Sequence, residues 1–201
     1  MTETNRKRGR DLFNKYKSIL HALCWVYKRF PLKIRIKLLV FHRYTGGKKG
    51  YGIRYALIKA IAKECGDNVF IGEGVFLMNP QNLKLGSNIS IHPMSYLECG
   101  NNKDNYIIIG NNVSIAHGVT IIATSHTYIS EKTDIIRDMK LKYAPIHICD
   151  NVWIGAKATV LLGVTIESGC VIGANSLINR DCKQDGIYAG CPASMVKSRF
   201  S

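Results

Sequence analysis

His126 is the residue of this chain that is best placed to do chemistry. It opens a polar and aromatic stretch, Ser125 to Ala144, and loops of this length in a compact domain are more often functional than idle. An imidazole has a pKa near about 6.5, so it can take a proton from a hydroxyl group near neutral pH. His126 is therefore a candidate general base. Such a base needs a carboxylate or a backbone carbonyl to fix its tautomer, and Glu98 and Asp134 are the candidate carboxylates.

The other histidines are expected to have structural or surface roles. His21 and His42 lie in the basic N-terminal part of the chain. A metal-dependent hydratase would need three convergent histidines, for which His92, His117 and His147 could be proposed. Their positions in the repeat described next do not agree, because the first two fall at corners and His147 should point outward. We therefore expect no metal site.

The stretch Ile146 to Asp181 repeats with a period of six. Every sixth residue is a β-branched aliphatic: Ile148, Ile154, Val160, Ile166, Ile172 and Ile178. Four residues after each of these comes a small or medium residue, Val152, Ala158, Val164, Cys170, Ser176 or Cys182, and turn-compatible residues recur at Gly155, Gly173 and Asn179. A helix repeats at 3.6 residues and a strand at 2, so a period of six fits neither alone. It predicts an all-β solenoid of stacked parallel coils.

The same period extends back to Ile71, with three interruptions. Residues Pro80 to Asn82 are expected to bulge at a corner, and Cys99 to Asn105 to widen another, since Lys103 stands where an aliphatic residue is due. The third interruption separates Ile121 from Ile148 and is 21 residues longer than one hexad. A solenoid tolerates such an insertion only as a loop outside the coil, which we place at residues 125–144.

The repeat and two motifs give a family resemblance. The motifs are Asn151-Val152-Trp153-Ile154-Gly155 and Gly190-Cys191-Pro192-Ala193. Over roughly residues 66–197 the chain resembles the hexapeptide-repeat acyltransferases, in particular the sugar and polysaccharide O-acetyltransferases that use acetyl-CoA. The resemblance implies a left-handed parallel β-helix with three hexads in each triangular coil. It also implies a homotrimer whose active sites lie between subunits.

Individual roles follow from the same resemblance. His126 stands where this family keeps its catalytic histidine, and the Ala156 N–H matches the donor to the thioester oxyanion. The implied contacts of acetyl-CoA are Trp153, Gly155, Ala156, Gly173 and Ala174 along the pantetheine arm, and Arg180, Lys183 and Lys197 at the phosphates. Ser194 replaces the Lys or Arg that ends the family's terminal motif, so Lys197 is expected to substitute. Glycine and alanine would also suit plain corners without a ligand.

The acceptor is predicted to be a sugar hydroxyl of a bacterial surface polysaccharide (capsule, O-antigen or exopolysaccharide) or of its precursor. The acceptor-holding Asn of some sugar acetyltransferases has no clear counterpart near Met94 to Leu97, and the candidate contacts are Glu98, Asp134 and Tyr143. No cysteine or serine stands at the matched active position, so direct transfer is expected. The alternatives are a free-sugar or antibiotic acetyltransferase of the same fold, or a non-catalytic basic adaptor at a membrane.

The first third of the chain is strongly basic. Residues 1–63 hold 17 Lys or Arg against Glu3 and Asp11, whereas residues 64–201 hold 11 basic and 12 acidic residues. Asp11 to Phe30 is predicted to be a helix, Leu32 to Leu38 either a strand or a continued helix, and Tyr55 to Glu64 a short helix that ends at Gly66 in the left-handed conformation. We therefore expect a mainly helical extension, residues 1–65, before a β-helix domain, residues 66–197.

Basic and apolar residues alternate irregularly between Ile19 and Phe41. Their mixture argues against a membrane span, which needs about 20 mostly apolar residues, but suits an interfacial segment. The extension could pack on the end of the solenoid, or hold the trimer on an anionic membrane surface; nucleic acid is not expected. Residues Met1 to Thr4 show no start of a secretory signal, and the seven cysteines form no C-x-x-C pair. We expect a cytoplasmic protein with reduced cysteines; if the extension binds lipid, the protein is peripheral on the inner membrane face.

Overall fold

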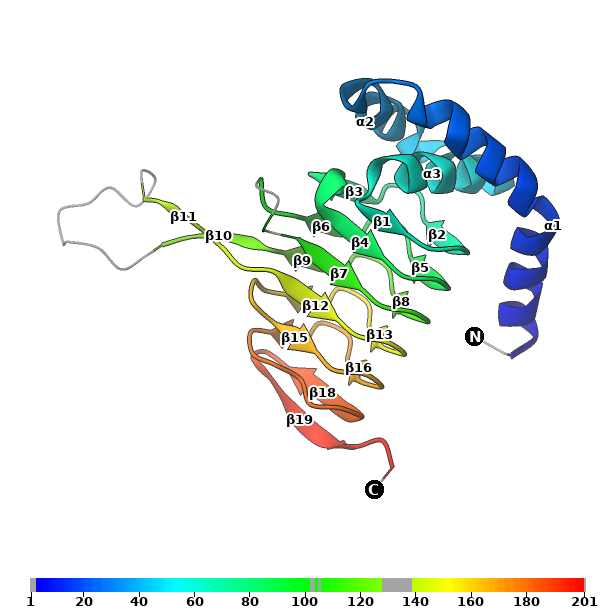
Figure 1. Cartoon of the computed structure of the whole chain (residues 1–201). Helices are drawn as coiled ribbons and strands as arrows, with labels where there is room; N and C mark the ends of the chain where they lie inside the picture. Colours follow the sequence, from blue (N-terminus) through cyan, green and yellow to red (C-terminus); the bar gives the residue numbers. More distant parts are fainter. Residues whose placement is uncertain (1–2, 102–103, 105, 128–138, 201) are drawn as a thin grey trace.

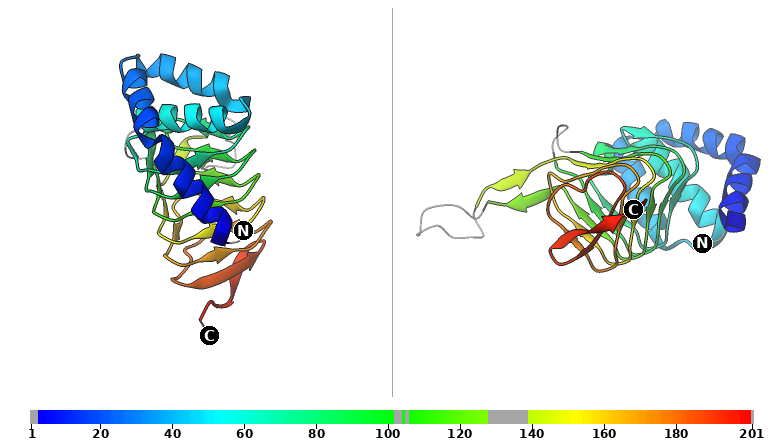
Figure 2. Two further views of the ribbon diagram at one scale, coloured as in Figure 1. Left: turned by 90° about the vertical axis from the view of Figure 1, so that its right-hand side faces the viewer. Right: turned by 90° about the horizontal axis from the view of Figure 1, so that it is seen from below.

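The chain forms a parallel β-solenoid that follows a helical region (Figure 1). The computed structural model describes residues 3–101, 104, 106–127 and 139–200, with the backbone alone for residues 3–10. Both the predicted solenoid and the predicted helical extension are confirmed. The helices gather at one end of the solenoid and along one side of it, and the C-terminus lies at the opposite end (Figures 1 and 2).

Short strands build three sheets. Sheet A contains β1 (Glu64–Cys65), β4 (Leu83–Leu85), β7 (Ile107–Ile109), β12 (Ile146–Ile148) and β15 (Thr165–Ile166). Sheet B contains β2 (Val69–Ile71), β5 (Ile89–Ile91), β8 (Ser114–Ile115), β13 (Trp153–Ile154), β16 (Val171–Ile172), β18 (Gly186–Gly190) and the antiparallel β19 (Ala193–Ser198). Sheet C contains β3 (Phe76–Met78), β6 (Tyr96–Glu98), β9 (Thr120–Ile122), β14 (Thr159–Val160) and β17 (Leu177–Ile178). The chain passes from A to B to C and back, so each coil has an A–B, a B–C and a C–A corner.

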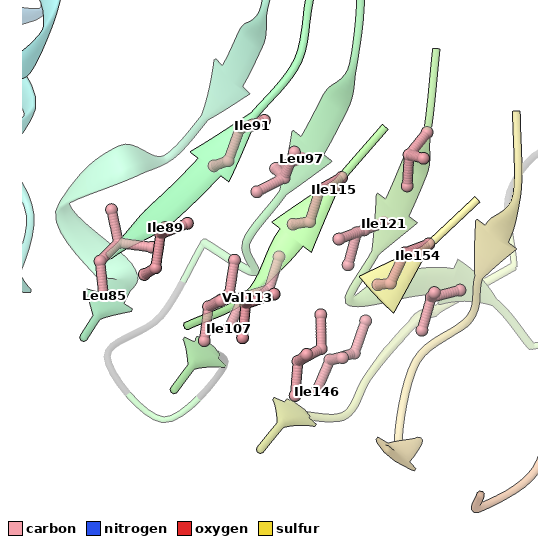
Figure 3. Close-up of a cluster of buried hydrophobic side chains, with 14 of the residues drawn as sticks. Leu85, Ile89, Ile91, Leu97, Ile107, Val113, Ile115, Ile121, Ile146 and Ile154 are labelled. Carbon is pink, nitrogen blue, oxygen red and sulfur yellow. The ribbon is translucent and has the colours of Figure 1, made fainter. Parts of the chain in front are cut away.

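The six-residue ladder fills the interior. Ile148 pairs with Ile166 in sheet A, and Ile154 pairs with Ile172 in sheet B, so paired ladder residues are three hexads apart, as the resemblance implies. The ladder residues and the hydrophobic residues that follow them, Cys170 and Cys182 included, are buried in one continuous core. Figure 3 shows part of this core, with Ile115, Ile121 and Ile154 among the labelled side chains. Each buried isoleucine contributes about 1.5–3 kcal/mol of hydrophobic free energy, so stacking stabilises units that could not fold alone.

Asparagine supplies much of the left-handed backbone at the corners. Positive φ values of 56° to 59° occur at the A–B corner in Asn68, Asn88, Asn112 and Asn151. Asn adopts this conformation at a lower cost than most residues with a Cβ. Gly155 has no positive φ; a Cβ there would lie 2.6 Å from the Ala174 nitrogen of the next coil. Its glycine is therefore required by close packing between coils, whether or not a ligand binds.

The interruptions of the repeat lie at the C–A corners. Residues Pro80–Asn82 form a 3-10 helix, η2, between β3 and β4, so the predicted bulge is confirmed. The widened stretch between β6 and β7 includes Lys103, which lies outside the described residues. The long insertion leaves the solenoid after β9 as a hairpin of β10 (Thr124–His126) and β11 (Leu141–Tyr143), and the chain re-enters at β12. This confirms that the insertion stands outside the coil.

The helical region differs in detail from the prediction. Helix α1 spans Glu3–Lys28, α2 spans Leu32–Phe41, η1 spans His42–Tyr44 and α3 spans Gly47–Ile61. The segment after Pro31 is thus a helix, not a strand. Helix α3 begins at Gly47 instead of the predicted Tyr55 and ends at Ile61 instead of the predicted Glu64. It ends earlier because Glu64 and Cys65 pair with β4 as the first strand of the solenoid. The predicted left-handed Gly66 is wrong: its φ is not positive, and it lies against the Gly86 backbone of the next coil.

Helix α3 covers the first coil. Its Leu57, Ile58 and Ile61 are buried in the same core as Val69 and Ile71. Arg54 of this helix is also buried, although its charge suggests a solvated residue. Its guanidinium donates to the carbonyls of Ile71 (2.9 Å) and Thr45 (2.7 Å), which ties the chain after η1 to the solenoid. Burial lowers the pKa of Arg54.

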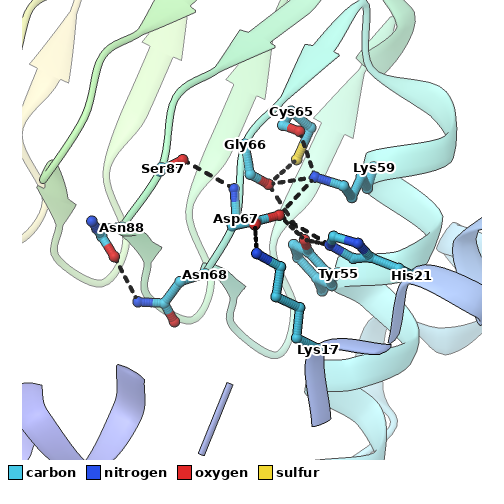
Figure 4. A network of polar contacts seen from close by, with 10 residues as sticks. All are labelled: Lys17, His21, Tyr55, Lys59, Cys65, Gly66, Asp67, Asn68, Ser87 and Asn88. Carbon is cyan, nitrogen blue, oxygen red and sulfur yellow. Dashed lines mark hydrogen bonds and ion pairs between the residues drawn. The ribbon is translucent and has the colours of Figure 1, made fainter. Parts of the chain in front are cut away.

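Asp67 fixes α1 and α3 to the first A–B corner (Figure 4). Lys17 and His21 of α1 lie 2.7 and 3.0 Å from its carboxylate oxygens. From α3, the Lys59 ammonium lies 3.0 Å away and the Tyr55 hydroxyl donates at 3.2 Å. One carboxylate therefore accepts from two helices, so α1 is held in a defined position on the solenoid.

Asp67→Asn should lower the free energy of unfolding by about 1–2 kcal/mol. This is the usual contribution of a charge-assisted hydrogen bond, reduced because the carboxylate is partly exposed to solvent. Burial alone would raise the pKa of Asp67, but the hydrogen bonds from Lys17, Lys59 and His21 outweigh it and hold this pKa well below its ordinary value. The carboxylate thus stabilises the fold above about pH 4, and this contribution is lost as the pH falls further. Denaturant unfolding at several acidic pH values should show the difference between wild type and variant shrinking. A constant difference would contradict the charge-based explanation.

Candidate active site

His126 stands at the end of β10, on the hairpin that leaves the C–A edge of the solenoid. It is exposed, and its Nδ1 lies 3.3 Å from the Met139 carbonyl oxygen across the hairpin. Because a carbonyl only accepts, Nδ1 must carry the hydrogen of the neutral ring. The lone pair is then on Nε2, which is the form that a general base requires. Of the possible partners expected from the sequence, the backbone carbonyl is the one found.

Glu98 lies at the base of the same hairpin but has other partners. The Tyr96 hydroxyl donates to one of its carboxylate oxygens at 2.7 Å, and the Thr124 hydroxyl donates to the other. Burial and the bond to Glu98 raise the pKa of Tyr96 to about 12, so its hydroxyl stays protonated as a donor. Thr124 and His126 alternate along β10 and share one face of the strand. The carboxylate is therefore fixed on the His126 side of the hairpin without orienting the imidazole.

Of the other two predicted acceptor contacts, Tyr143 and Asp134, the structure describes only Tyr143. Tyr143 is half-buried in β11 and pairs with Thr124, which places it beside Glu98 at the hairpin base. Asp134 lies outside the described residues. Glu98 and Tyr143 thus come together near the point where the hairpin joins sheet C.

The predicted pantetheine contacts occupy the B–C corner of two successive coils. Gly155 and Ala156 follow β13, and Gly173 and Ala174 follow β16, whose strands are paired. Ala174 is exposed and Ala156 half-buried. The Ala156 carbonyl accepts the Asn175 N–H at 2.9 Å, whereas no backbone carbonyl of the described residues accepts the Ala156 N–H. A corner with small outward side chains and an unused N–H fits a thin amide-containing arm and an oxyanion.

The remaining predicted acetyl-CoA contacts are spread over other parts of the solenoid. Trp153 and Lys197 are exposed on the outer face of sheet B, and Val171 and Ile187 lie between them in the same column. Arg180 is exposed at a C–A corner after β17. Lys183 and Lys197 are not equivalent, because the Lys183 ammonium already lies 3.1 Å from a carboxylate oxygen of Glu167. One chain therefore does not gather all of these residues at a single place.

The three histidines of the hydratase alternative do not converge. His92 and His117 belong to successive coils at the B–C corner, where burial and the neighbouring His117 lower the pKa of His92. His147 projects from sheet A and stacks on Tyr106, with ring centroids 5.8 Å apart. In the described part of the chain, no three His, Cys, Asp or Glu residues are grouped as metal ligands.

Sequence reasoning missed the residues that hold the site in place. These are Met139, whose carbonyl orients His126, and Thr124 and Tyr96, which hold Glu98. Thr124 could have been found from its alternation with His126, two residues later. The role of Met139 had no signal, because it depends on the register of β10 against β11.

Known proteins share both the repeat and the fold. A family model described as bacterial transferase hexapeptide (six repeats) matches residues 145–180. The galactoside O-acetyltransferase of Escherichia coli K12 is 30% identical over 145 residues, which are 72% of this chain and 68% of that protein. The chain belongs to the hexapeptide-repeat acetyltransferases. The predicted family and the predicted acyltransferase are thereby confirmed.

Other members of the family agree. The galactoside O-acetyltransferase of Lactococcus lactis is 31% identical over 147 residues, 72% of this chain and 67% of that protein. A solved galactoside acetyltransferase in complex with coenzyme A superposes with a TM-score of 0.72, at 28% identity, over 83% of this chain and 80% of that one. A hexapeptide-repeat acetyltransferase of Vibrio cholerae, complexed with acetyl coenzyme A, shares the fold with a TM-score of 0.68 at 22% identity, over 90% of this chain and 87% of that one.

Proposed function

We propose that this hexapeptide-repeat acetyltransferase transfers an acetyl group from acetyl-CoA to a sugar hydroxyl of a bacterial surface polysaccharide or its precursor. The observation that carries the proposal is the exposed His126, whose Nδ1 is tied to a backbone carbonyl and whose Nε2 is left with its lone pair. An imidazole in this state can take a proton from a bound hydroxyl group.

His126 acts as a base in the proposed reaction. Its Nε2 accepts the hydroxyl proton while the hydroxyl oxygen forms a bond to the thioester carbon. The Ala156 N–H donates to the carbonyl oxygen as negative charge develops there. When the carbon–sulfur bond breaks, His126 returns the proton to the leaving sulfur, so the ring ends neutral. No group of the enzyme is acetylated on the way.

The acceptor class rests on two observations. Relatives that cover most of this chain are named galactoside O-acetyltransferases, which supports a sugar hydroxyl. His126 stands exposed on a hairpin outside the solenoid, so an extended acceptor does not have to enter a pocket within one subunit to reach it. A free galactoside is the second candidate, favoured by the names of those relatives. Mass spectrometry of surface glycans from cells with and without the protein tests the first, and turnover with free sugars tests the second.

The complete site is proposed to lie between subunits of a homotrimer. His126 leaves the solenoid at a C–A corner, whereas Ala156 and Ala174 lie at the B–C corner. A side of six residues at about 3.3 Å per residue separates these corners by about 20 Å, which is too far for one base to serve the donor at the other corner. A second solenoid packed alongside can bring its own B–C corner to the hairpin.

Mixing two inactive variants tests the shared site. Subunits with His126→Ala lack the base, and subunits with Ala174→Trp lack the donor corner. In randomly mixed trimers, about a quarter of the sites combine an intact base from one subunit with an intact donor corner from another. We expect mixtures to recover activity up to about that fraction of the wild-type value, after joint refolding or co-expression. If the base and the donor corner of a site come from one chain, mixing the two variants restores no activity. Light scattering of the wild type separately distinguishes a trimer from a monomer.

A further inference from the structure

The outward faces of α1 and α2 carry apolar side chains that are exposed to solvent. Trp25 is 61% exposed, Phe41 78% and Ile34 43%. The opposite face of α2 packs into the protein, because Ile36, Leu38 and Leu39 join the core of the first coil. Capping of the solenoid thus accounts for the inward apolar residues of the extension and leaves the outward ones unexplained.

Basic residues accompany these apolar side chains. Residues 12–63 contain 13 Lys or Arg and no Asp or Glu. On α2, Lys33, Ile34, Lys37, Val40 and Phe41 are all exposed, at helical spacings that group them away from the packed face. We call these five residues, together with Trp25 and Phe30, the basic end surface. Helix α2 lies at the end of the molecule away from β19 (Figure 1), so its exposed residues are at that end.

We propose that the basic end surface binds an anionic lipid bilayer. Lysine ammonium groups meet the lipid phosphates, and the aromatic and aliphatic side chains enter the headgroup region, as in other interfacial helices with a Lys/Arg belt. None of the described helices is long and apolar enough to cross a membrane, so the contact is with its surface. The inference is independent of the acceptor proposed above.

Charge favours lipid over the other possible occupants. A second copy of the same surface would bring Lys33 and Lys37 against identical charges, which opposes a symmetric contact. Nucleic acid would attract the lysines but offers no apolar medium for Ile34 and Phe41. A bilayer surface satisfies both kinds of side chain at once.

The surface is also preformed. Lys17 and His21 hold α1 to Asp67, and Arg54 ties the chain after α2 to the first coil. The Arg29 guanidinium lies 3.0 Å from the Trp25 ring centroid, which keeps the indole beside a cation at the surface. Little ordering is therefore needed on binding, which favours affinity.

Vesicle co-sedimentation of the full-length protein tests the proposal. Phosphatidylcholine vesicles with and without phosphatidylglycerol are compared across a salt series. Wild type should bind only the anionic vesicles and release them as salt rises. The double variant Lys33→Gln/Lys37→Gln should weaken vesicle binding about 30-fold, because each lysine contributes about fivefold. Phe41→Ser should weaken vesicle binding about tenfold, because it removes an apolar side chain from the interface.

Two matched variants serve as controls. Lys140→Gln/Lys142→Gln removes the same charge from the hairpin side of the molecule, where both lysines are exposed. Phe200→Ser removes an aromatic ring that is 76% exposed at the far end. Both should bind vesicles within about twofold of wild type. Wild type that does not bind, or losses equal in test and control variants, would overturn the proposal. The proposal would also be overturned if the test variants bound vesicles like wild type but changed the oligomeric state measured by light scattering. The same holds if they bound vesicles like wild type but lost RNA binding.

Discussion

His126→Ala should lose acetyl transfer by about 10²–10⁴-fold in kcat, the usual contribution of a single general base. The side chain is exposed on β10 and lies outside the core, so the fold should persist. Affinity for acetyl-CoA should also be nearly unchanged, because the predicted pantetheine contacts lie at the B–C corner and on sheet B. Steady-state kinetics with the acceptor glycan, together with calorimetry of acetyl-CoA binding, are the measurements.

Lys142→Ala is the matched control for this variant. Lys142 pairs with Ser125 and projects from the other face of the hairpin from His126. It reports any effect of truncating a hairpin side chain, and its kcat should stay within about twofold of wild type. Near-full turnover in His126→Ala would contradict the assignment and direct the search to His92 and His117 at the B–C corner.

Ala174→Trp should weaken acetyl-CoA binding by about 100-fold or more, which corresponds to roughly 3 kcal/mol. Ala174 is exposed at the B–C corner, so an indole there fills the proposed pantetheine path without disturbing the core. Arg180→Ala should cost less, roughly 1–3 kcal/mol for one charge-assisted phosphate contact. Calorimetry with acetyl-CoA and with dephospho-CoA measures both effects.

Ser168→Trp provides a matched bulky substitution at a different corner. Ser168 precedes Gly169 at the A–B corner of the same part of the solenoid and is not among the predicted contacts. Ser168→Trp should bind acetyl-CoA like wild type, and its thermal unfolding measures the cost of a tryptophan at a half-buried corner position. Normal binding by both Ala174→Trp and Arg180→Ala would place the donor groove elsewhere.

The core of the solenoid could be predicted because its signal is local and repeated. Each hexad presents one aliphatic residue, such as Ile154 or Ile172, at the position that must point inward, and all six agree in phase. A break in that phase also locates the hairpin, because a coil cannot absorb additional residues. The helix boundaries were less predictable: α3 ends at Ile61 because Glu64 and Cys65 find a partner in β4, which no local pattern shows.

The coil, its buried ladder, the position of His126 at the start of the insertion and the basic extension can thus all be predicted from the order of the residues. The partners of the functional side chains depend on contacts that form only in the folded chain. Met139, rather than Glu98, orients His126, because the register of β10 and β11 brings that carbonyl to the ring. Arg54 is buried because carbonyls from η1, Thr45 and the first coil converge on it. These contacts join residues 9 to 17 positions apart, and the register of the hairpin and the packing of α3 on the first coil set their distances. The inward phase of a hexad, by contrast, is fixed within six residues.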